Sequence, residues 1–289
     1  MKIRVLTDSA GCLSKEQAEA YGIDFLPLQV IVEGKTYLDG ADITNSQLYD
    51  MMEKGAFPQT SQAPLGMIEE LFSTYEKEGV TDVILVTLSP ALSGTNENIC
   101  AAAMRYGIKI HTTDTYSTLH IEQYWARCAK ALVDQGVEPE EIIRRLNNSI
   151  AESKGFLVVE DLAYLAKGGR LTPLAAKFGG MLKIVPILEV SKETGGKVDM
   201  YEKVRTMPKA IKTAVKTITS NMKGNAQEYY FVLMDSRASQ SAQLAQKELL
   251  NIFPELKIER DDICAVINCH TGMGSVGMQF AKKVEGVEL

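Results

Sequence analysis

Short apolar runs alternate with amphipathic stretches through the first half of the chain. The apolar runs are rich in β-branched residues and predict strands, whereas apolar residues at helical spacing between them predict helices. The predicted strands are Ile3–Thr7, Phe25–Val32, Val83–Leu88 and Ile108–Thr112. The predicted helices are Ser14–Tyr21, Leu65–Lys77, Glu97–Tyr106, Leu119–Gln135 and Pro139–Ala151. This alternation is typical of a doubly wound parallel sheet.

The order of elements changes after Gly155. Two strands, Met181–Val190 and Lys197–Glu202, are separated only by a turn-rich Glu-Thr-Gly-Gly segment, which predicts an antiparallel hairpin. The remaining predicted elements are strands at Phe156–Glu160, Tyr229–Met234 and Ile263–Asn268, a short helix through Leu165, and helices at Pro208–Met222 and Ser239–Ile252. We therefore predict an α/β protein of two domains, 1–154 with the parallel sheet and 155–289 with a mixed sheet.

Composition and charge argue against several classes of function for this protein. A net charge of −6 disfavours binding to a nucleic-acid backbone, and no run of 18 apolar residues is present that could cross a membrane. The N-terminus has no apolar segment of signal-peptide length, and the five cysteines form no Cys-x-x-Cys pair. These features predict a cytoplasmic protein with free thiols. The three histidines show no metal-ligand spacing, so we expect no metal site.

Two segments carry hydroxyl groups that could bind an anion. Thr60 and Ser61 lie in a loop between prolines, just before a predicted helix, where they could bind an anion or equally begin the helix. Ser93, Gly94 and Thr95 join a predicted strand to a predicted helix. Free N–H groups and the helix dipole favour a carboxylate or phosphate there, although a simple helix cap is the alternative. A third polar segment, Thr7-Asp8-Ser9, is more typical of a turn or cap.

His270 and Thr271 precede a glycine-rich segment. Residues 272–277 match Gly-x-Gly-x-x-Gly, but only twelve residues follow Gly277 (289 − 277 = 12), too few for the rest of a dinucleotide-binding unit. We therefore expect a tight turn that places His270 at the end of a strand, where it could donate a hydrogen bond to a carboxylate. A hydrolase triad of Ser93, His270 and an acid stays open, although Ala91 breaks the Gly-x-Ser-x-Gly pattern.

Taken together and in order, these segments resemble the DegV family over nearly the whole chain. The resemblance rests on Thr7-Asp8-Ser9, Tyr37-Leu38-Asp39-Gly40, Pro58 with Thr60-Ser61-Gln62, Leu92-Ser93-Gly94-Thr95, Leu162-Ala163-Tyr164-Leu165, Lys167-Gly168-Gly169-Arg170, Pro186-Ile187-Leu188 and His270-Thr271-Gly272. Each motif is weak by itself, whereas the ordered set is specific.

The resemblance implies a carrier rather than an enzyme. Two domains would enclose a long-chain fatty acid between them, without a cofactor, and present it to a dihydroxyacetone-kinase-like fatty acid kinase that uses ATP to form an acyl phosphate. The residues implied to hold the carboxylate are Thr60, Ser61, Ser93, Gly94, Thr95, His270 and Thr271. Arg170 and Arg205 are implied to contact the kinase or the phosphorylated product. Transient contact with a membrane surface is compatible with this function. The alternatives are a stand-alone Ser/His hydrolase or another small-molecule enzyme, and a sensor of another small anion.

Overall fold

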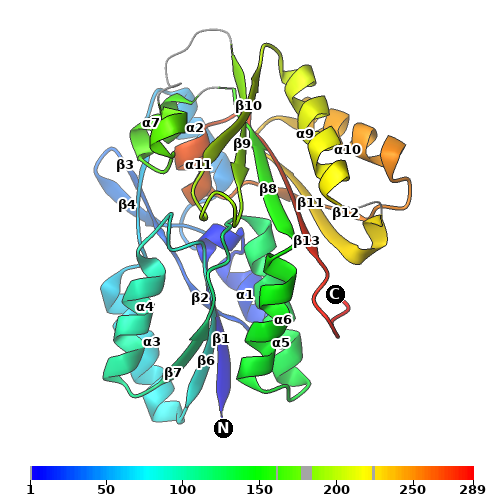
Figure 1. The fold of residues 1–289 in the computed structure, drawn as a ribbon. Helices are drawn as coiled ribbons and strands as arrows, with labels where there is room; N and C mark the ends of the chain where they lie inside the picture. Colours follow the sequence, from blue (N-terminus) through cyan, green and yellow to red (C-terminus); the bar gives the residue numbers. More distant parts are fainter. Residues whose placement is uncertain (1, 161, 177–183, 223–224) are drawn as a thin grey trace.

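The computed structural model describes residues 2–160, 162–176, 184–222 and 225–289 (Figure 1). The N-terminal half is built on a four-stranded parallel sheet in the order β2-β1-β6-β7. Its strands are β1 (Ile3–Asp8), β2 (Asp24–Leu26), β6 (Asp82–Val86) and β7 (Lys109–Thr112). The parallel sheet predicted for this half is confirmed.

Helices cover both faces of this sheet because successive side chains of each strand point to opposite faces. Leu6 and Leu85 pack into the cluster that includes α3 (Leu65–Glu78) and α4 (Thr95–Arg105). Val5 and Ile84 pack on the opposite face, against α5 (His120–Asp134) and α6 (Pro139–Ile150). Figure 1 shows these two helix pairs on opposite sides of the strands. Two short helices, η1 (Ser9–Gly11) and α1 (Lys15–Tyr21), lie between β1 and β2 in the chain.

A small antiparallel sheet that was not predicted follows β2. The predicted strand Phe25–Val32 is wrong as a single element, because β2 ends at Leu26 and a new strand begins at Gln29. Pro27 lies at the break, and proline cannot donate a hydrogen bond within a strand ladder. The new sheet has the order β4-β3-β5. Its elements, with the helix that follows β4, are β3 (Gln29–Val32), β4 (Lys35–Leu38), α2 (Asn45–Glu53) and β5 (Gln59–Ser61).

The C-terminal half is built on a six-stranded mixed sheet in the order β10-β9-β8-β13-β11-β12. Its strands are β8 (Ser153–Val158), β9 (Val185–Val190), β10 (Asp199–Val204), β11 (Tyr229–Asp235), β12 (Ile258–Asp262) and β13 (Val276–Lys282). The antiparallel hairpin is confirmed as β9 and β10, while residues 181–183 of the predicted strand lie outside the described residues. The mixed sheet is therefore confirmed. The domain division at 154/155 stays a prediction, and it falls inside β8.

Two long helices cover one face of the mixed sheet, and the other face meets the N-terminal half. The covering helices are α9 (Met207–Asn221) and α10 (Ser239–Ile252), with the short η2 (Ala226–Glu228) after α9 (Figure 1). Phe156 and Phe231 point toward these helices, whereas Leu157 and Val232 belong to the cluster shared with the N-terminal half. Two short helices, α7 (Ala163–Gly168) and α8 (Pro173–Ala176), follow β8. The core is therefore continuous between the two halves.

The predicted strand Ile263–Asn268 is wrong. β12 ends at Asp262, and the apolar run forms helix α11 (Ala265–Thr271) instead. A short apolar run cannot be assigned by periodicity alone, because a fully buried helix and a buried strand both give it. Helix α11 ends at Thr271 and is capped by Gly272, whose φ of 70° is readily adopted by glycine, and the chain continues into the unpredicted strand β13. His270 therefore lies on a helix and not at a strand end.

His120 connects the two halves of the molecule. Its Nδ1 lies 2.5 Å from Asp261 Oδ2 and its Nε2 lies 2.7 Å from the Tyr230 hydroxyl, so α5 is joined to β12 and β11. Burial acts to lower the pKa of His120, but hydrogen bonds and charge from Asp261 and Glu259 outweigh it and raise the pKa above 6.5. The imidazolium form therefore strengthens the connection between the halves.

Candidate functional site

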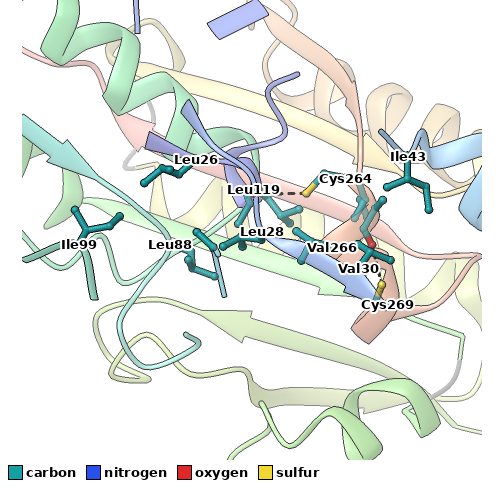
Figure 2. Packing of buried hydrophobic residues seen from close by; sticks show 14 of the residues in the cluster. Leu26, Leu28, Val30, Ile43, Leu88, Ile99, Leu119, Cys264, Val266 and Cys269 are labelled. Atoms are coloured by element: carbon teal, nitrogen blue, oxygen red, sulfur yellow. Dashed lines mark hydrogen bonds between the residues drawn. The ribbon is translucent and has the colours of Figure 1, made fainter. Parts of the chain in front are cut away.

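A cavity of about 270 Å³ lies where the N-terminal half meets the free face of the mixed sheet. Figure 2 shows four of its apolar residues, Leu28, Leu88, Leu119 and Val266, beside one another. The rest of its apolar and weakly polar wall comprises Leu92, Thr118, Gly155, Phe156, Leu157, Leu165, Val190, Val198, Ile267 and Gln279. Such a wall suits an alkyl chain, because each buried methylene contributes about 0.8 kcal/mol.

The predicted polar residues converge on this same cavity. Six of the seven residues predicted to hold a carboxylate line it, namely Thr60, Ser61, Ser93, Gly94, His270 and Thr271. The seventh, Thr95, does not line the cavity but holds Ser93: its backbone N–H donates to Ser93 Oγ at 3.3 Å, and the two hydroxyl oxygens are 2.9 Å apart. The structure thus brings together segments far apart in sequence, while the role of each residue stays a prediction.

The closest polar contact in the cluster joins Thr60 to His270. Thr60 Oγ1 lies 2.8 Å from His270 Nε2, and β5 and α11 supply the two residues. Burial, followed by the positive charge of Arg170, lowers the pKa of His270 from 6.5 to about 4. The imidazole is therefore neutral at cellular pH. When its Nε2 carries the proton and donates to Thr60 Oγ1, the Thr60 hydroxyl proton is free to donate to a ligand.

A glycine allows His270 to occupy this position. A Cβ placed on Gly168 would lie 2.2 Å from His270 Nδ1, so no side chain fits there without moving the ring. His270 Nδ1 is buried and has no hydrogen-bond partner among the described residues. Gly168 belongs to α7, so the fixed position of the imidazole depends on the close approach of α7 to α11. Sequence reasoning treated Gly168 only as part of a turn and a family motif.

Ser93 and Gly94 lie at the N-terminus of α4. Gly94 is the N-cap and has no side chain to cap the helix, and the Thr95 N–H donates to Ser93 Oγ, so the N–H groups after Thr95 are oriented toward the end of the helix where Ser93 lies without a side-chain cap from Gly94. Gln62 also lines the cavity, and its Oε1 accepts a hydrogen bond of 2.8 Å from Asn98 Nδ2 on the same helix. Hydroxyls, N–H groups and the helix dipole therefore favour an anion here.

The two predicted arginines lie in different places. Arg170 lines the cavity with Thr60 and His270. Its Nε donates to Leu92 O at 3.4 Å, and its Nη1 donates to Gly168 O at 2.5 Å. Arg205 is exposed after β10 and is not among the residues that line this cavity. Sequence reasoning assigned Arg170 to a partner or product only, whereas the structure also places its charge beside the polar cluster.

In the described part of the chain, Ser93, His270 and an acid do not form the hydrogen-bonded triad that a Ser/His hydrolase requires. Ser93 Oγ is hydrogen-bonded to Thr95, and His270 Nε2 is hydrogen-bonded to Thr60. No described acid accepts a hydrogen bond from His270 Nδ1 to orient the ring. Among the same residues, no group of three or more histidine, cysteine, aspartate or glutamate side chains is placed to hold a metal ion. The helices described here include none long and apolar enough for a transmembrane span.

The segment Thr7-Asp8-Ser9 serves the fold. Asp8 accepts hydrogen bonds from Ala10 N at 2.8 Å and Leu88 N at 3.2 Å, and Ser9 Oγ accepts one from Leu28 N at 3.0 Å. Burial raises the pKa of Asp8 to about 7. These bonds hold Leu28 and Leu88, which form part of the cavity wall, so this segment supports the site without lining it.

Comparisons with known proteins all find similarity to one family. A family model described as an uncharacterised protein of the DegV family matches residues 2–283. Protein DegV of Bacillus subtilis is 30% identical over 288 residues, which are 98% of this chain and all of that protein. A crystal structure of a fatty acid binding DegV family protein from Streptococcus agalactiae gives a TM-score of 0.89 at 30% identity, covering 98% of this chain and 99% of that one. The structure of DegV from Bacillus subtilis, described as a fatty acid binding protein, gives 0.86 at 29% identity, covering 98% and 100%.

Proposed function

The chain belongs to the DegV family, and from that premise we propose that it binds a long-chain fatty acid and presents the carboxylate to a separate ATP-dependent kinase. One observation carries the proposal: an apolar cavity has the hydroxyls of Thr60 and Ser93, a neutral His270 and the cation Arg170 gathered in its lining. The names of the two similar crystal structures support the same ligand class.

The apolar and polar parts of this lining have different roles in binding. The apolar wall removes the acyl chain from water, which supplies affinity in proportion to the methylenes buried. A carboxylate loses hydration on entering such a cavity, and several hydrogen-bond donors are needed to offset that cost. Thr60, Ser93 and the N-terminus of α4 supply neutral donors, and Arg170 supplies charge. The tail then sets affinity, and the head group sets orientation.

In the proposed reaction this chain holds the nucleophile. A carboxylate oxygen of the fatty acid attacks the γ-phosphorus of ATP held by a dihydroxyacetone-kinase-like partner, the bond from that phosphorus to ADP breaks, and acyl phosphate and ADP result. A neutral His270 can hydrogen-bond to this carboxylate without forming an ion pair with it. Arg170, at the cavity, and Arg205, on the surface, are the proposed contacts for the kinase.

The proposal places this exchange in the cytoplasm, with transient contact at a membrane surface from which the acid is taken. All five cysteines are free thiols, which suits a reducing compartment. Phe57 and Leu65 flank β5 and expose 38% and 61% of their surface, so apolar side chains are available close to Thr60 for such a contact.

A comparison of charged and uncharged ligands tests the proposal. The purified protein would be extracted with organic solvent and the extract analysed by mass spectrometry. The lipid-free protein would then be titrated calorimetrically with palmitate and with methyl palmitate, which has the same chain but no charge. We expect a co-purified fatty acid, and palmitate should bind more tightly than its methyl ester.

The matched control is the double variant Thr60→Val, Ser93→Ala, which removes two hydroxyls and keeps the apolar wall. It should lower the affinity for palmitate and leave that for methyl palmitate nearly unchanged. A wild-type protein that carries no fatty acid and does not bind palmitate would overturn the proposal.

A further inference from the structure

A cavity rich in carboxylates lies apart from the proposed fatty acid site. It measures about 510 Å³ and shares no lining residue with the cavity that contains Thr60 and His270. Its described lining includes no lysine, arginine or histidine, but it includes five acidic residues, which are Glu16, Asp39, Asp42, Asp261 and Asp262. We call this space the acidic cavity.

Three segments far apart in sequence supply the five carboxylates. Glu16 lies in the first turn of α1, and Asp39 and Asp42 lie between β4 and α2. Asp261 and Asp262 are the last residues of β12, so both halves of the molecule contribute to the cavity. Asp261 is paired with the histidine of α5, whereas the other four form no ion pair with a described residue. The cavity therefore carries negative charge that the described chain does not neutralise.

Asp39 is the most deeply buried of these acids. Only 2% of its surface is exposed, and its Oδ2 is buried without a hydrogen-bond partner among the described residues. Burial raises the pKa of Asp39 to about 7. A buried carboxylate oxygen without a donor costs free energy, which a bound cation with N–H groups would offset. No residue of the motif Tyr37-Leu38-Asp39-Gly40 lines the cavity proposed for the fatty acid, so this motif has no role in that site.

The N-termini of α1 and α2 also reach the acidic cavity, and free N–H groups there would favour an anion instead. Both N-termini are closed by capping boxes. Ser14 Oγ accepts from Gln17 N at 3.2 Å, and Thr44 Oγ1 accepts from Gln47 N at 3.3 Å. Each glutamine side chain in turn accepts from the backbone N–H of its N-cap residue at 2.8 Å. The carboxylates therefore determine which sign of charge the cavity attracts.

The spacing of the carboxylates favours an elongated organic cation over a metal ion. A metal ion needs several ligands around one point, and no three acidic, histidine or cysteine side chains of the described chain are placed to hold one. Leu13 and Ile43 are buried apolar residues that line the same cavity. A chain of methylene groups that separates several ammonium groups can contact these apolar residues while each charge meets a different carboxylate.

We propose that the acidic cavity binds a linear polyamine, with Asp39 and Asp262 as ligands of its ammonium groups. The inference goes beyond the proposed function and does not depend on it, because it requires neither the fatty acid nor the kinase. Asp39 belongs to the N-terminal half and Asp262 to the C-terminal half, so a polyamine that contacts both joins the two halves. Binding to the folded protein also stabilises it, and the melting temperature should rise with polyamine concentration.

The test uses spermidine as the probe, titrated calorimetrically into the full chain at constant ionic strength, with n-butylamine and Mg²⁺ as comparison ligands. The first variant is Asp262→Asn, because Asp262 is exposed and the isosteric change should not disturb folding. The second is Asp39→Asn. The control is Glu76→Gln, since Glu76 is exposed on α3 and lines neither cavity.

We expect spermidine to bind the wild type more tightly than n-butylamine or Mg²⁺ does. Asp262→Asn should weaken spermidine roughly three- to tenfold, the range for a partly exposed charge-assisted contact, and Asp39→Asn should weaken it at least as much. Glu76→Gln should leave the affinity for spermidine unchanged, and Asp262→Asn should leave that for palmitate unchanged.

Several results would overturn the polyamine site. One is a wild type that does not bind spermidine, and another is a spermidine affinity that Asp262→Asn does not change, whether or not Asp39→Asn folds. Equal affinity for n-butylamine would show a site for a single ammonium group, and equal affinity for Mg²⁺ would show general attraction of cations. A wild type that bound spermidine through Asp262 but did not bind palmitate would overturn the proposed function and leave the polyamine site standing.

Discussion

Replacing Gly168 by alanine would drive a methyl group into the imidazole of His270. The new Cβ would lie 2.2 Å from Nδ1 and 3.0 Å from Cε1, whereas ordinary contact begins at 3.4 Å. The ring would have to withdraw by more than an ångström, which would break the 2.8 Å contact between Nε2 and Thr60 Oγ1. The substitution therefore tests whether a fixed imidazole holds the head-group site together.

Two opposing effects determine how much Gly168→Ala changes the free energy of unfolding. Alanine in a helix is favoured over glycine by about 1 kcal/mol, whereas overpacking costs about 1–3 kcal/mol. We expect Gly168→Ala to leave the free energy of unfolding unchanged or lower it by about 2 kcal/mol. The loss of one hydrogen bond to a charged ligand costs about 1.5–3 kcal/mol, so palmitate affinity should fall by roughly tenfold or more.

Thermal melts and palmitate titrations of two companion variants complete the test. Gly66→Ala is the matched control: Gly66 is also helical, and its Cβ would meet nothing within 4 Å, so this change should stabilise the protein slightly and not alter affinity. In a His270→Ala background, Gly168→Ala no longer meets the ring and should become stabilising. If Gly168→Ala keeps full affinity, or is equally harmful without the imidazole, the reasoning about His270 is refuted.

Three further predictions concern other parts of the account. Ser93→Ala should weaken palmitate by roughly tenfold, because it removes one hydroxyl donor from the head-group site, and should lower the melting temperature only slightly, because Thr95 loses one hydrogen-bond partner; loss of folding instead would show a mainly structural role. Arg170→Ala should reduce both palmitate affinity and kinase-dependent acyl phosphate formation, whereas Arg205→Ala should reduce only the latter, since only Arg170 lines the cavity; an Arg205 variant with weakened palmitate binding would contradict this. Because the pKa of His120 is raised in the folded protein, its stabilising effect is present below about pH 6.5 and is lost as pH rises through the higher folded value. Melts across that range should therefore fall more steeply for the wild type than for His120→Gln, and parallel curves would exclude the effect.

The spacing of apolar residues was sufficient to predict the helices and strands in which that spacing is regular. The strands of the parallel sheet have apolar side chains on both faces, and the amphipathic helices around them show a clear stripe, so both were predicted. Helix α11 was mistaken for a strand because it is short and none of its residues is exposed, so no solvent-facing polar stripe reveals its period. The small sheet was missed because its strands are only three or four residues long and one follows a proline break.

Most residues of the candidate site could be predicted from the sequence, but the contacts between them could not. Ser93 carried a local signal, since a hydroxyl beside glycine at a helix start is typical of an anion site. The Thr60 to His270 contact joins residues 210 positions apart, and no local pattern predicts such a contact. For the same reason, sequence did not show that Arg170 lines the cavity while Arg205 does not, or that Gly168 makes room for an imidazole. The arrangement of the two cavities likewise depends on packing between the halves.

The most direct test of the central claim is the carbon NMR spectrum of palmitate labelled at its carboxyl carbon and bound to the protein. The account predicts one bound carboxyl resonance that shifts in both Thr60→Val and Ser93→Ala, because both hydroxyls contact the head group. A bound resonance that is identical in the wild type and both variants would contradict the placement of the carboxylate at this site, and the absence of any bound resonance would contradict fatty acid binding itself.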